Sequence, residues 1–101
     1  MLTLVLSGCG TTHTYRVLTG AARPAFDGPV RVVLEPDLPP AGFQEIAIIE
    51  AKCAGTHADL EHVVAGLQRE AARLGCTIVV RVRIDQGASL ATGTGVCGIV
   101  P

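Results

Sequence analysis

The sequence predicts a small α+β domain, in which a sheet of three to four strands, in the order β-β-α-β-β, is covered by one long helix. Residues 56–74 repeat apolar side chains at the spacing of one helical stripe. Residues 77–85 then alternate apolar and polar side chains, as a half-buried strand does. The chain has 101 residues, which is the usual length of one domain.

The helix is the most clearly predicted element. Thr56, followed three positions later by Asp59, has the pattern of a capping box, and Gly75 stands where a left-handed residue commonly ends a helix. The apolar side chains between them recur three and four positions apart: Leu60, Val63, Val64, Leu67, Ala71 and Leu74. We therefore expect this stripe to pack on the sheet.

Four strands are predicted, over residues 30–34, 44–53, 77–85 and 94–100. A loop with three prolines separates the first two, and the glycines of the last strand indicate close backbone approach or a bulge. The predicted core comprises Ile49, Leu60, Val63, Val64, Leu67, Leu74, Ile78, Val80, Val82, Ile84 and Val96.

The N-terminus carries a second informative pattern. Residues 1–6 are an apolar run, and Leu6-Ser7-Gly8-Cys9 matches the lipobox of bacterial lipoprotein signal peptides, whose cysteine thiol receives the lipid. The run is short and lacks a positively charged start. We interpret residues 1–8 as a truncated lipoprotein signal segment. The alternative is an ordinary strand followed by an ordinary buried cysteine.

This interpretation divides the rest of the chain in two. Residues 9–29 are rich in Thr, Gly, Ala and Pro without an apolar period, so we expect a flexible tether that begins at the lipidated Cys9. Residues 30–101 would then form the single α+β domain. Gly10 after the cysteine is not the aspartate of inner-membrane retention, which favours the periplasmic face of the outer membrane.

Composition excludes some partners. Eight basic and nine acidic residues give a formal net charge of −1, so we expect no binding to nucleic acid. Only 3% of the residues are aromatic, which leaves no stacking platform for bases. No apolar run is long enough for a transmembrane helix. The expected partners are the membrane, through the lipid anchor, and an envelope protein.

Residues 70–85, E-A-A-R-L-G-C-T-I-V-V-R-V-R-I-D, and the later G-T-G-V resemble two related families. One is the YbjQ-like family, labelled heavy-metal-binding, with the form A-x-x-L-G-A-N-A-V-x-x-V-R-F-D and G-T-A-V. The other is the RcsF-like family of outer-membrane stress-sensor lipoproteins. The resemblance covers about residues 44–100. It implies a helix packed on a sheet and a non-enzymatic envelope lipoprotein with a sensing or binding domain.

The resemblance also bears on the cysteines. Cys53 and Cys97 fall where the RcsF-like family has structural cysteines, which implies a Cys53–Cys97 disulfide in an oxidising compartment. Cys76 would then be a free, buried thiol. If the chain is cytosolic, three buried thiols are expected instead. That alternative corresponds to a soluble YbjQ-like domain that forms a homo-oligomer, with metal binding left open.

Catalytic and metal-binding residues are not predicted. Cys53, His57 and His62 lie close in sequence, but no metal-binding pair has the usual spacing, and helical positions five apart point in different directions. Surface histidines near a helix cap are the favoured interpretation. Neither serine has a nucleophile context, and no cofactor motif is present. Arg81 and Arg83 are expected to share one strand face, either solvated or against an acidic partner.

Overall fold

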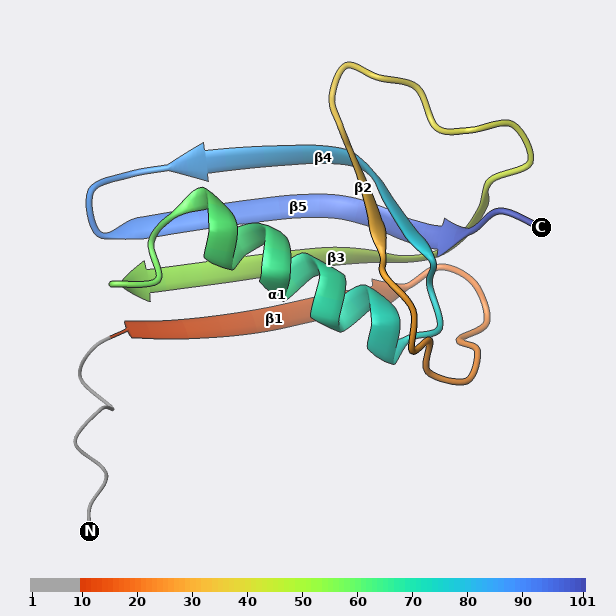
Figure 1. The fold of residues 1–101 in the computed structure, drawn as a ribbon, viewed down its shortest axis with the longest axis horizontal. Helices are drawn as coiled ribbons and strands as arrows, with labels where there is room; N and C mark the ends of the chain where they lie inside the picture. Colours follow the sequence, from red (N-terminus) through yellow and green to blue (C-terminus); the bar gives the residue numbers. More distant parts are fainter. Residues whose placement is uncertain (1–9) are drawn as a thin grey trace, which may run out of the picture.

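A five-stranded mixed sheet with one helix across it makes up the fold of the computed structural model, which describes residues 10–101 (Figure 1). The spatial order of the strands is β1-β3-β5-β4-β2; β2 runs parallel to β4, and the other neighbours are antiparallel. The elements are β1 (Gly10–Leu18), β2 (Arg31–Leu34), β3 (Gln44–Gly55), α1 (Leu60–Arg73), β4 (Ile78–Gln86) and β5 (Leu90–Ile99).

The predicted fold class is therefore wrong in its proportions. The domain is mostly sheet, with five strands instead of three to four, and its helix has only 14 residues. The helix is shorter than predicted because Asp59, and not Thr56, is the N-cap: its side chain accepts a hydrogen bond from the His62 N–H. The chain before Asp59 instead forms a turn, in which the N–H groups of His57 and Ala58 donate to the carbonyls of Ala54 and Gly55.

The extra strand comes from the segment that was expected to be a tether. Residues 10–18 pair with β3 without a register shift, from Gly10 opposite Gly55 to Leu18 opposite Ala47. The sequence T-T-H-T-Y-R-V is rich in β-branched and aromatic residues that favour strands. The glycines, alanines and prolines of residues 19–29 obscured this signal when the whole segment was taken together. The following segment also packs on the domain, because the N–H groups of Arg23 and Phe26 donate to carbonyls at the end of α1.

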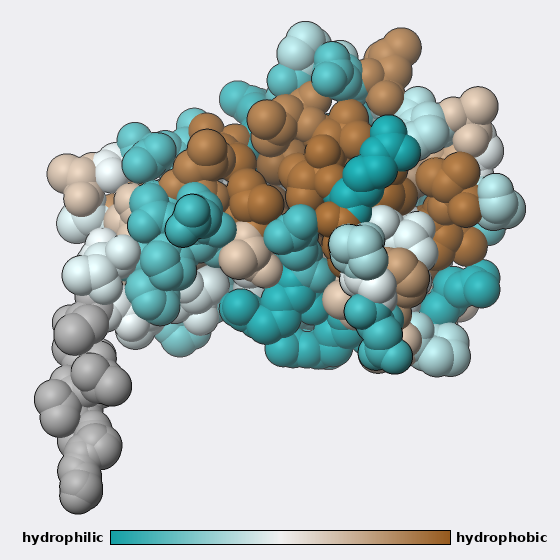
Figure 2. Space-filling view, in the orientation of Figure 1, coloured by the Kyte–Doolittle hydropathy of each residue, from teal (hydrophilic) through white to brown (hydrophobic). Residues whose placement is uncertain are grey.

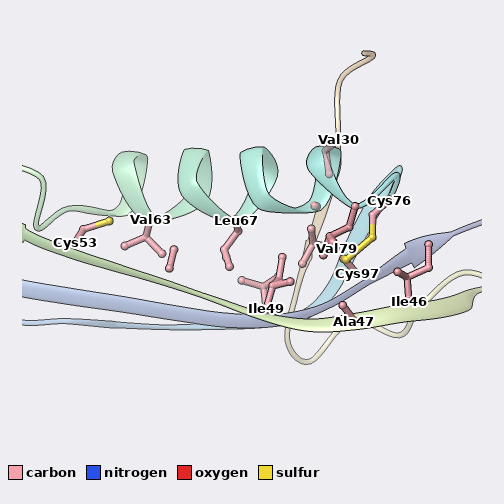
Figure 3. Packing of buried hydrophobic residues seen from close by; sticks show 14 of the residues in the cluster. Val30, Ile46, Ala47, Ile49, Cys53, Val63, Leu67, Cys76, Val79 and Cys97 are labelled. Carbon is pink, nitrogen blue, oxygen red and sulfur yellow. A yellow bond between two sulfur atoms is a disulfide. The ribbon is translucent and has the colours of Figure 1, made fainter. Parts of the chain in front are cut away.

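The core lies between α1 and one face of the sheet (Figure 3). Val63 and Leu67 are fully buried over Ile49. The helix approaches β5 closely, because a methyl group at Gly93 would collide with Val63. A methyl group at Gly98 would collide with the backbone carbonyl of Gln44 in β3, which is the close backbone approach expected of the last strand.

Most of the predicted core is confirmed, and the exceptions are informative. The buried members are Ile49, Val63, Leu67, Leu74, Ile78, Val80 and Val82. Val64, Ile84 and Val96 are half-buried, and Leu60 is 51% exposed. A register shift between Val80 and Arg83, with Arg81 at a φ of 53°, interrupts the predicted alternation and places both Val79 and Val82 under the helix.

A buried carboxylate ties β1 to the helix. Glu70 of α1 is only 1% exposed. Its Oε1 accepts hydrogen bonds from Thr14 Oγ1 at 2.8 Å and Arg73 Nη1 at 3.1 Å, and its Oε2 accepts from Arg16 Nη1 at 3.0 Å. A buried charge is tolerated when it is paired and hydrogen-bonded in this way. Two of its three partners belong to β1, so Glu70 holds the edge strand against α1.

We expect Glu70→Ala to destabilise the domain by about 1–3 kcal/mol in urea unfolding, since it removes a buried hydrogen-bonded carboxylate while both arginines remain half exposed and solvated. Hydrogen exchange should speed up most in β1. Glu61→Ala, at an exposed position of the same helix, is the control. Equal exchange rates in β1 for both variants would contradict this role of Glu70.

Candidate functional site

The cysteines are paired differently from the prediction. Cys97 forms a disulfide with Cys76, with a Cα–Cα distance of 5.7 Å, and Cys53 is a buried free thiol. The expected Cys53–Cys97 bridge and the free Cys76 are both wrong. Cys53 lies opposite Ala91 of β5, and Cys97 lies six residues further along that strand, about 20 Å away at the rise of a β-strand. Cys9 lies outside the described residues.

The disulfide closes the C-terminal end of the helix onto the sheet. Cys76 follows the C-cap Leu74 and Gly75, whose φ of 84° is the left-handed conformation expected there. Its partner Cys97 lies between Ala47 of β3 and Val79 of β4 in the sheet (Figure 3). The bond thus joins the turn after α1 to the central strand β5.

Replacing both Cys76 and Cys97 by alanine should lower the free energy of unfolding by about 2–4 kcal/mol, the usual contribution of a native disulfide. The decisive comparison is with a reductant. Reduction should destabilise the wild type and Cys53→Ala by similar amounts and leave the double variant unchanged. Loss of the reductant effect in Cys53→Ala would show that Cys53 forms the bridge after all.

Polar and titratable side chains gather at the other end of the helix, and we call this group the His57 cluster: Thr12, Cys53, His57, Asp59 and His62. Thr12 connects β1 to the group, because its Oγ1 lies 2.9 Å from His57 Nδ1 and 3.6 Å from the Sγ atom of Cys53. The two imidazole rings stack, with centroids 4.0 Å apart and planes 11° from parallel. The cluster lies beside the start of β1, since a side chain at Gly10 would collide with Thr56 and His57.

The stacking corrects the prediction that His57 and His62 point apart. That argument placed both residues on one helix, whereas α1 begins at Leu60 and His57 lies in the turn before it. The turn folds His57 back over the first helical turn. Sequence spacing therefore missed the contact because the helix boundary was placed too early.

Asp59 organises the exposed part of the cluster. It caps α1 by accepting the His62 N–H at 2.8 Å, and its two carboxylate oxygens lie 2.8 and 3.0 Å from His62 Nδ1. The backbone N–H of His62, and after it the His62 side chain, hold the pKa of Asp59 below its usual value of 3.8. The carboxylate is thus ionised at neutral pH, next to the positive end of the helix dipole.

The sign of this pKa change gives a pH prediction. A carboxyl group with a lowered pKa in the folded state stabilises that state at neutral pH, and the stabilisation is lost as the pH falls through the lowered pKa. Asp59→Ala should therefore reduce the thermal midpoint at pH 7, and the difference from the wild type should shrink as the pH falls below 3.8. Asp27→Ala, at an exposed loop position, is the control; a constant difference down to low pH would contradict the assignment.

The His57 cluster is poorly arranged for a metal ion. A metal binds an imidazole nitrogen in the plane of the ring, and two nearly parallel rings share no such position. Both Nδ1 atoms also have hydrogen-bonding partners, Thr12 and Asp59. Among residues 10–101, no group of three or more His, Cys, Asp or Glu side chains is placed to hold a metal ion. The buried Cys53 thiol is inaccessible to solutes.

The remaining predicted residues lie apart from this cluster. Arg83 pairs with Glu35 at the end of β2, with 3.5 Å between Nε and Oε1, and Arg81 is an exposed residue at the irregular point of β4. Sequence reasoning missed Glu70. Its place between Leu67 and Ala71 on the buried stripe, three residues before Arg73, was the signal for a buried and compensated carboxylate.

Comparison with protein-family models, curated proteins and solved structures finds no match to this chain.

Proposed function

We propose that this protein is a non-enzymatic bacterial envelope lipoprotein, anchored through Cys9, whose folded domain senses or binds another envelope component. The observation that carries the proposal is the motif Leu6-Ser7-Gly8-Cys9 directly after an apolar run. The resemblance to the RcsF-like family supports the same assignment. We place the anchor in the outer membrane, facing the periplasm, because Gly10 follows the cysteine.

The disulfide supports export. Stable disulfides persist in the periplasm and on cell surfaces and are rare in the cytosol of most organisms. Cys76–Cys97 joins two segments of a domain whose small core gains from such a bond. A domain that contains the Cys76–Cys97 disulfide is therefore expected in an oxidising compartment.

The position of β1 changes how the anchor would work. The first strand begins at Gly10, the residue immediately after Cys9, so a lipid on Cys9 would hold the domain directly at the bilayer surface without a flexible spacer. No helix within residues 10–101 is long and apolar enough to span a bilayer. In this proposal the lipid on Cys9 supplies the attachment.

A soluble homo-oligomer is the second candidate, and one observation favours it. β1 is an edge strand of nine residues without proline or a register shift, and its outer edge is unpaired within the described chain. Long regular edges of this kind pair readily with another strand. The opposite edge, β2, has only four residues.

The test is the intact mass of the membrane fraction from cells that express the gene with its native upstream region. We expect a mass increase that matches acylation, absent in Cys9→Ala, and a further gain of one hydrogen on each of Cys76 and Cys97 after reduction. An unmodified chain in the soluble fraction, with all thiols free, would refute the lipoprotein proposal. Sedimentation of that soluble chain as an oligomer would then support the second candidate.

A further inference from the structure

The strand β4 continues past the point where its neighbour β2 ends. The last paired residues are Leu34 and Val82, and the last hydrogen bond across this boundary runs from the Glu35 N–H to the Val82 carbonyl at 3.1 Å. The backbone groups of a strand that face one side recur every second residue. The N–H and C=O of Ile84 therefore point to the same side as those of Val82, where the described chain places no partner strand.

Apolar side chains line the space beside this free edge. Leu60 at the start of α1 is 51% exposed, Leu34 at the end of β2 is 48% exposed, and Ile84 is half-buried. Figure 2 shows hydrophobic surface gathered over this side of the molecule, above α1. A shallow groove of about 350 Å³ lies here, and we call it the β4 groove. Its lining residues are Leu34, Glu35, Leu60, Val82, Arg83, Ile84 and Asp85.

The apolar pattern of α1 and that of β4 both extend beyond the end of β2. Leu60 and Ile84 belong to the two patterns that predicted the core, yet β2 is too short to reach over them. Apolar residues left at the end of a regular pattern, next to unpaired backbone, indicate a place that a further strand completes.

The charges at the groove favour a basic partner. Arg83 is paired with Glu35. Asp85 lies at the far end of the groove and forms no ion pair with any of the described residues, so the rim keeps one uncompensated carboxylate. A Lys or Arg next to the bound strand would neutralise it.

We propose that the β4 groove binds an extended peptide segment of a partner protein, which adds to β4 after the end of β2, inserts an aliphatic side chain between Leu60 and Ile84, and places a basic residue at Asp85. An extended peptide fits because it supplies backbone donors and acceptors at strand spacing together with side chains for the slot. The inference rests on the proposed binding role of the domain and does not require the lipid anchor.

The test uses the full chain with Cys9→Ala, which removes acylation from the measurement. A phage-displayed library of random linear peptides is selected against it, and the enriched peptides are synthesised and titrated while amide chemical shifts are recorded. We expect enriched sequences with aliphatic residues beside Lys or Arg, and shift changes concentrated at Ile84, Gln86 and Leu60. Binding should also weaken with salt, since Asp85 contributes by charge.

The variant Leu60→Gln should weaken peptide binding about tenfold or more, because it places an amide in the apolar slot. Leu90→Gln is the matched control: Leu90 is 47% exposed and lies at the start of β5, outside the groove. Asp85→Asn should lower the affinity for basic peptides about two- to fivefold and reduce its salt dependence. Circular dichroism confirms that each variant is folded.

Four outcomes would overturn the inference: no enriched peptide, equal binding by Leu60→Gln and the wild type, shift changes away from β4 and α1, or self-association that Leu60→Gln abolishes. The last would show that a second copy of the chain fills the groove. Failure here leaves the acylation of Cys9 unaffected. Conversely, if the mass measurement finds the wild-type chain unacylated while the Cys9→Ala chain binds peptides at the β4 groove, only the lipid anchor is refuted.

Discussion

The buried carboxylate of Glu70 is the constraint on which the arrangement of this domain depends. A charge that is 1% exposed needs hydrogen bonds on both oxygens, and Thr14, Arg16 and Arg73 provide them. Because two of these partners are in β1, the carboxylate is satisfied only when β1 lies at the sheet edge under α1. Residues 10–18 are thus part of the folded domain.

The helix is fixed unevenly along its length. The Cys76–Cys97 bond holds the turn after its C-terminus, and Glu70 ties its third turn to β1. Its N-terminal turn is held by the Asp59 cap and by the packing of Val63, while Leu60 stays half exposed. The strand on that side, β2, ends early. The free strand edge and the exposed apolar residues therefore lie together at this end of the domain.

Four residues of the His57 cluster, all but Thr12, were named from the sequence, but the contacts between them were not predicted. Cys53, His57 and His62 were weighed together because they are neighbours along the chain, and they do belong to one cluster. Thr12 joins them only through the pairing of β1 with β3, which a local pattern does not encode. Cys97 was likewise recognised as a disulfide residue, but with the wrong partner, because strand register decides which cysteines meet.

The sequence alone determined the end of the helix and most of its buried face, the presence of β2, β3, β4 and β5, and the close approach of the glycines in the last strand. These features follow from local periodicity and side-chain size, which act over a few residues. The tertiary structure decided the membership of β1, the disulfide partner of Cys97, the burial of Glu70 and the exposure of Leu60. Each of these depends on which distant strands lie side by side and where each one stops, and contacts between residues far apart in the chain set both.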